Sequence, residues 1–94
     1  MDILNVVLSK QAQWDVTKVP FYIVIKLQAW IDSVGLSGLR EVRKLPGYHD
    51  EPLHGARGGQ RSIRLNRAYR AIYIIDKDGA VEIIKVLEVN KHDY

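Results

Sequence analysis

Four arginines recur at every third position of the segment QRSIRLNRAYRAIYII, residues 60–75: Arg61, Arg64, Arg67 and Arg70. Guanidinium groups bind phosphate oxygens in bidentate fashion and keep their charge when partly desolvated. Any one of these arginines could instead be a solvated strand residue in a scattered salt bridge. Arg70 fits that explanation less well, because apolar residues follow it and a buried arginine needs an anionic partner. The segment therefore indicates a surface that binds phosphate groups.

Few side chains could transfer a proton. The three histidines are His49, His54 and His92, and none has a partner at a metal-ligand spacing such as HExxH, so no metal site is expected. Each is most simply a surface histidine, although His92, two residues before Tyr94, could project a proton donor from the end of a strand. Glu51 is a lone carboxylate at the entrance to a glycine-rich loop. It could be a general base or only a solubilising loop residue.

The composition is that of an ordinary globular protein. The 94 residues suit one domain, residues 1–94, and are 47% hydrophobic and 27% charged. No apolar run is long enough to cross a bilayer, and the start MDILNVVLSK lacks the basic region of a signal peptide, so we expect a cytoplasmic protein. The absence of cysteine excludes disulfides, thiolate catalysis and cysteine-type zinc sites.

The positive charge is concentrated in one stretch of the chain. The formal net charge is only +3, but residues 54–73 contain five arginines and no acidic residue. A basic segment of this density points to a nucleic acid or an acidic protein as partner.

The elements that must position these residues fall into two halves. In the first, residues 2–9 suggest a strand, Ser9 offers an N-cap for a helix over 10–18, and Pro20 suits the first turn of a longer helix. The apolar positions of that second helix recur at helical spacing, and glycines should break or kink it before another two turns. The residues that define these features are Val24, Leu27, Ile31, Val34, Gly35, Gly38, Leu39 and Val42. Both tryptophans are expected in the core.

The second half has a different pattern. Residues 47–59 form one long irregular region, and loops of this length in a small domain are often functional. Three β-rich segments follow, over 60–65, 69–76 and 80–89, with Asp78-Gly79 as a strong hairpin signal. The arginine segment could instead be a basic amphipathic helix, but it has no cap and many isoleucines, so strands are favoured. Ile63 should then face one side of the first strand and Arg64 the other.

The segments EPLHG, RSIRLNRAYRAIY and VEIIKVLEVNKHDY, within residues 51–94, resemble the RelE superfamily of type II toxins, the ribosome-dependent mRNA interferases. The terminal His-x-Tyr and the Glu-Pro-Leu-x-Gly loop are similar to the YoeB and HigB branches. The resemblance implies an α+β fold in which an N-terminal strand and two helices pack on a mainly antiparallel sheet completed by a C-terminal three-stranded meander.

The resemblance also implies an activity, the metal-free cleavage of RNA by attack of a 2'-hydroxyl on the adjacent phosphorus. Glu51 then matches the proposed base, Arg70 the transition-state clamp and His92 the acid, with Tyr94 as a second donor or a stacking group. Arg64 is expected to stabilise charge rather than move protons, because arginine keeps its proton near neutral pH. Further residues expected to contact RNA are Arg57, Arg61, Arg67, Lys91 and His54.

The partners implied are mRNA on the ribosome and a cognate antitoxin that is acidic where it meets the arginines. Neither a membrane nor a cofactor is expected. A non-catalytic module of the same fold, which binds RNA or the antitoxin, is the alternative, and a ribosome-independent ribonuclease is a lesser variant. The joint presence of Glu51, Arg70 and His92 favours an enzyme, since a pure binding protein would not need all three.

Overall fold

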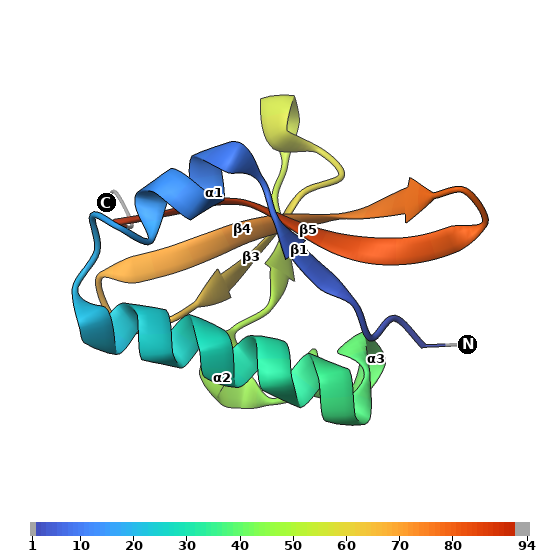
Figure 1. Cartoon of the computed structure of the whole chain (residues 1–94), viewed down its shortest axis with the longest axis horizontal. Coiled ribbons are helices and arrows are strands. Elements are labelled where there is room, and N and C mark those ends of the chain that lie inside the picture. The colour runs from blue at the N-terminus through green and yellow to red at the C-terminus, as the bar shows by residue number, and fades with distance from the viewer. Residues whose placement is uncertain (1, 92–94) are drawn as a thin grey trace.

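The computed structural model describes residues 2–91, which form a five-stranded sheet with helices packed on it (Figure 1). The order across the sheet is β1-β5-β4-β3-β2, with β1 parallel to β5 and all other neighbours antiparallel. This confirms the predicted α+β arrangement of an N-terminal strand, helices and a C-terminal meander. The strands are β1 (Val6–Leu8), β2 (Glu51–Pro52), β3 (Arg61–Arg64), β4 (Tyr69–Asp78) and β5 (Val81–Lys91).

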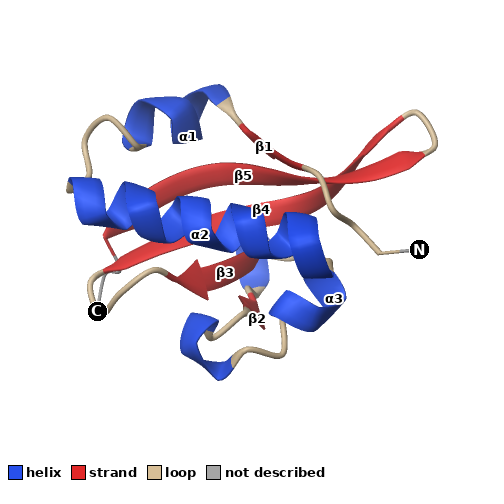
Figure 2. Cartoon of the chain, turned by 60° about the horizontal axis from the view of Figure 1, so that its bottom comes forward, coloured by secondary structure: helices blue, strands red, loops and turns tan. Residues whose placement is uncertain are grey.

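Helices precede the meander. Figure 2 shows the longest, α2 (Phe21–Ser37), lying across one face of the sheet, while α1 (Lys10–Asp15) lies beside β1 and β5. The predicted N-cap is confirmed, since Ser9 Oγ accepts a hydrogen bond of 3.0 Å from the backbone N–H of Ala12. The helix α1 ends at Asp15, three residues earlier than predicted. None of the described helices is long and apolar enough to span a membrane.

The helix α2 follows Pro20 and runs without a break through Gly35. It ends at Gly38, which has a φ of 83°, a conformation that is unfavourable for residues with a Cβ atom. The single turn α3 (Leu39–Val42) begins directly after Gly38. The buried residues of α2 are Ile23, Leu27, Trp30 and Val34. The predicted buried positions Val24 and Ile31 are only half-buried, so the buried stripe is rotated by one residue from the prediction at those two turns.

The predicted hairpin joins β4 and β5, with Gly79 at a φ of 64° in the connection. A bulge beside Ile72 and Tyr73 shifts the register of the two strands. The irregular region before them contains two short 3-10 turns, η1 (Pro46–Tyr48) and η2 (Gly55–Arg57), with β2 between them. Residues 49–51 therefore connect η1 to the outer edge of the sheet.

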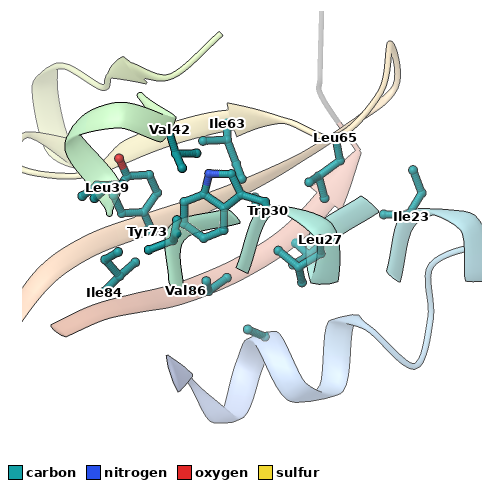
Figure 3. Close-up of a cluster of buried hydrophobic side chains, with 14 residues drawn as sticks. Ile23, Leu27, Trp30, Leu39, Val42, Ile63, Leu65, Tyr73, Ile84 and Val86 are labelled. Atoms are coloured by element: carbon teal, nitrogen blue, oxygen red, sulfur yellow. The ribbon is translucent and has the colours of Figure 1, made fainter. Parts of the chain in front are cut away.

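The core fills the space between α2 and the sheet, and Figure 3 shows its side chains. At its centre the rings of Trp30 and Tyr73 lie 5.4 Å apart between centroids, tilted by 43°. Trp14 is 60% exposed, so the prediction that both tryptophans are core residues is wrong for Trp14. The opposite face of the sheet carries Arg64 and Arg70, and it is this face that bears the candidate site.

Candidate functional site

Arg64 on β3 and Arg70 on β4 are direct cross-strand partners. Ile63 and Leu65 are buried in the core, so the alternation of the strand turns Arg64 to the face away from α2, as predicted. Opposed Cβ atoms in an antiparallel pair lie about 5 Å apart, and side chains of like charge at directly opposed positions destabilise the pair. The fold thus holds two positive charges together at a cost that a bound anion would offset.

Arg70 is half-buried and is held from the side of β5. Its Nε donates to Asn90 Oδ1 at 3.4 Å, and Asn90 Nδ2 donates to Glu88 Oε1 at 3.1 Å. The same carboxylate oxygen forms a 2.6 Å ion pair with Arg57. Within residues 2–91 no carboxylate lies at ion-pair distance from Arg70. The anionic partner predicted for this arginine is therefore not one of the described residues.

The turn that joins β3 to β4 is closed by Asn66. Its Oδ1 accepts hydrogen bonds of 2.8 Å from the backbone N–H groups of Ala68 and Tyr69. An asparagine that hydrogen-bonds the backbone two or three residues later fixes the local course of the chain. Arg67, in this turn, lines the same pocket as Arg64 and Arg70, so three of the four regularly spaced arginines contribute to one surface.

Asp50 anchors the segment between η1 and β2. Its side chain is 1% exposed, and it accepts hydrogen bonds of 2.6 Å from Arg61 Nε and 2.5 Å from the Tyr73 hydroxyl. Burial and the hydrogen bond to Asp50 raise the pKa of Tyr73 to about 12. Burial alone would lower the pKa of Arg61, but the hydrogen bond and charge of Asp50 outweigh it and raise that pKa. Asp50, Arg61 and Tyr73 thus form a hydrogen-bond network that includes an ion pair and is centred on a buried carboxylate.

The residues on either side of Asp50 reach the opposite face of the sheet. Glu51 pairs with Ser62 on β3, and His49 and Glu51 both line a pocket formed with the arginines. Glu51 is exposed and has no ion pair with another described residue. The pocket combines one carboxylate, one imidazole and three guanidiniums, and its lining residues are His49, Glu51, Ser62, Arg64, Asn66, Arg67, Tyr69 and Arg70.

Several predicted site residues lie elsewhere. Arg61 is on the α2 side of β3 and is paired with Asp50, so the expectation that it shares a surface with Arg64 is wrong, because neighbouring arginines three apart on a strand face opposite sides. Arg57 is bound to Glu88, on the side of the sheet that carries Asn90 and Arg70. His54 and Lys91 are exposed and are not among the lining residues of the pocket. The predicted residues His92 and Tyr94 lie outside the described residues.

Three contributors to the site were not predicted from the sequence: His49, Asp50 and Asn90. His49 and Asp50 directly precede Glu51 in the chain, and this adjacency was the available signal. In residues 2–91 no three histidine or carboxylate side chains come together in a group that could hold a metal ion.

Comparison with known proteins gives the fold a context. No protein-family model matches the sequence, and no curated protein matches it. Several solved structures do. They include a YoeB/ParE toxin from Agrobacterium tumefaciens, with 20% identity, a TM-score of 0.66 and coverage of 95% of this chain and 99% of that one. The chain has the RelE-like toxin fold.

Two other toxin structures support this. The YoeB dimer from Staphylococcus aureus is 23% identical, with a TM-score of 0.67 and complete coverage of both chains. The E. coli DinJ-YafQ toxin-antitoxin complex matches at 17% identity and a TM-score of 0.72, over 98% of this chain and 94% of that one. These neighbours are RelE-superfamily type II toxins, and the predicted resemblance to that superfamily is confirmed at the level of the fold.

Proposed function

We propose that this protein is the toxin of a type II toxin-antitoxin system and that it cleaves mRNA on the ribosome. The observation that carries the proposal is the pocket in which Glu51 lies with Arg64 and Arg70. Such a combination suits cleavage of a phosphodiester, which needs a proton acceptor and cations for the charge that develops on phosphorus. The fold shared with YoeB and YafQ toxins supports it.

In the proposed reaction the 2'-hydroxyl of one nucleotide attacks the neighbouring phosphorus. Glu51 accepts the hydroxyl proton as the new oxygen-phosphorus bond forms. Arg64 and Arg70 stabilise the added negative charge of the pentacoordinate phosphorus. The bond from phosphorus to the 5'-oxygen then breaks, and a proton donor protonates that oxygen. The products are a 2',3'-cyclic phosphate and a free 5'-hydroxyl.

The resemblance assigns the proton donor to His92, with Tyr94 near it. Because both lie outside the described residues, these roles stay predictions, as does the contact of Arg61, Arg67, Lys91 and His54 with RNA. The contacts of Arg57 support a positioning role. Its ion pair holds the carboxylate of Glu88, which accepts a hydrogen bond from Asn90, and Asn90 in turn accepts one from Arg70.

The proposed partners follow from the charge of the site and from the neighbours. An antitoxin would cover the surface around Arg64 and Arg70 with acidic side chains, which keeps mRNA out of the pocket. One of the matched structures is a toxin bound to its antitoxin, the E. coli DinJ-YafQ complex. Cleavage on the ribosome places the protein in the cytoplasm.

The test is cleavage of a defined mRNA during translation in vitro, with the cuts mapped by primer extension. Arg70→Ala should slow cleavage roughly a hundredfold, the effect of one lost electrostatic stabiliser. Arg40→Ala is the matched control, because Arg40 is an exposed arginine of α3 outside the pocket lining. Cleavage by Arg70→Ala at the rate of the control would remove Arg70 from the mechanism. RNA binding without any cleavage by the unmodified protein would favour the non-catalytic module.

A further inference from the structure

The hydroxyl of Ser62 lies in the pocket without a partner. Ser62 is only 8% exposed and lines the pocket together with Glu51 and Arg64. No group within residues 2–91 forms a hydrogen bond with its side chain, and the hydroxyl oxygen is not sealed off in the way that the indole nitrogen of Trp30 is. The serine is therefore buried as a residue, while its hydroxyl stays accessible from the pocket.

The neighbours of Ser62 on the sheet define what this hydroxyl faces. Ile63 is buried in the core, so the alternation of β3 turns Ser62 to the same face as Arg64, about 7 Å further along the strand. Across the sheet Ser62 is paired with Glu51 on one side and with Ile72 on the other. Ile72 is fully buried and has no polar side-chain atom. The hydroxyl thus lies between the carboxylate of the pocket and its arginines.

This placement indicates the chemistry of the missing partner. A buried hydroxyl that makes no hydrogen bond costs stability, so its retention in β3 calls for a ligand. A hydroxyl can donate one hydrogen bond, whereas the guanidinium groups beside it are donors only. A phosphate oxygen accepts hydrogen bonds from both kinds of group. An anion held by Arg64 and Arg70 would therefore also satisfy Ser62.

We infer that Ser62 is a catalytic residue whose hydroxyl donates a hydrogen bond to a non-bridging oxygen of the phosphate that is cleaved; this inference rests on the proposed function. The serine keeps its proton throughout and forms no bond to phosphorus. When the 2'-hydroxyl attacks, the non-bridging oxygens gain negative charge, and a hydrogen bond to a more highly charged oxygen is stronger. The contact therefore accelerates cleavage in addition to holding the RNA.

The first test is Ser62→Ala, which removes the hydroxyl alone. It should slow mRNA cleavage roughly tenfold, the effect of one lost hydrogen bond to a charged group. Its midpoint of thermal unfolding should equal or exceed that of the unmodified protein, because no hydrogen bond within the described chain is lost. Ser37→Ala is the matched control, since Ser37 is an exposed serine at the end of α2 outside the pocket lining. A lower midpoint for Ser62→Ala would contradict a hydroxyl without a partner and would overturn the inference.

The second test locates the contact on the phosphate. At the mapped cleavage site one non-bridging oxygen is replaced by sulfur, a weak hydrogen-bond acceptor, and the two diastereomers are cleaved separately. Ser62→Ala should slow one diastereomer by less than about threefold and the other about as much as the normal mRNA, because only the first has already lost the acceptor. Equal slowing of all three substrates, or slowing of none, would overturn the inference while the proposed function stands. If the unmodified protein and Ser37→Ala cleave no substrate, the proposed function fails and the inference with it.

Discussion

Tyr73→Phe removes one hydroxyl and keeps the ring that packs on Trp30. Burial, followed by the hydrogen bond to Asp50, raises the pKa of Tyr73 from 10.0 to about 12. A phenol whose pKa is higher in the folded than in the unfolded state stabilises the fold fully below about pH 10, and this contribution is lost as the pH rises through about 12. Two pH units correspond to about 3 kcal/mol, of which roughly half is lost by about pH 11.

The free energy of unfolding is measured by urea denaturation at about pH 8 and about pH 11, followed by tryptophan fluorescence. Between these two conditions the free energy of unfolding of the native protein should fall further than that of Tyr73→Phe, by roughly half of those 3 kcal/mol. Tyr22→Phe is the control, because Tyr22 is 61% exposed and its removal should leave the pH dependence of the native protein unchanged. An equal loss in Tyr73→Phe and the native protein would refute the buried contact between Tyr73 and Asp50.

Two further predictions concern the pocket. Arg64→Gln should raise the free energy of unfolding by about 0.5 kcal/mol, because it removes a like charge opposite Arg70, and should slow mRNA cleavage at the same time. Urea denaturation and primer extension measure the two effects, and a variant that is destabilised would contradict the repulsion between Arg64 and Arg70. Cleavage should also persist in a chelator at a concentration that leaves ribosomes intact, and its loss there would count against metal-free chemistry.

The parts of the fold that the sequence predicted are those governed by neighbouring residues. Ser9 caps α1 through its own first turn, and Gly79 adopts the positive φ that the hairpin needs. The ends of the elements were less predictable, since α1 ends three residues earlier than expected. The segment FYIVI has strand-forming residues yet lies in α2, because helical spacing of apolar residues buries Ile23 and Leu27 against the sheet.

Contacts between distant residues could not be predicted from the sequence. Counting back from the hairpin, where Asp78 pairs with Val81, would place Val89 opposite Arg70. The bulge beside Tyr73 adds one residue and brings Asn90 there instead. Nothing in the local sequence indicates that bulge, so the hydrogen bond from Arg70 to Asn90 could not be predicted. The same holds for Asp50, whose partner Tyr73 lies 23 residues away.

The spacing of the arginines also has a structural reason. A strand alternates faces at every residue, so Arg61 and Arg64 must point to opposite sides of β3. The antiparallel turn closed by Asn66 then brings Arg70 opposite Arg64. One strand thus supplies a partner for Asp50 on its inner face and, on its outer face, an arginine of the proposed phosphate-binding pocket. In the proposed function, mutating Arg61 would therefore lower cleavage through the position of Glu51, because Arg61 holds Asp50 directly before it in the chain.

Two features that each cost stability meet in the same pocket. His49 holds a left-handed backbone, at a cost of about 1 kcal/mol, and Arg64 lies opposite the like charge of Arg70, at about 0.5 kcal/mol. Natural sequences depart from local stability chiefly at functional sites, since selection acts there on activity. In the proposed function, one bound phosphate would relieve the charge repulsion between Arg64 and Arg70, so the anion that the pocket would hold explains why the two arginines are placed opposite each other.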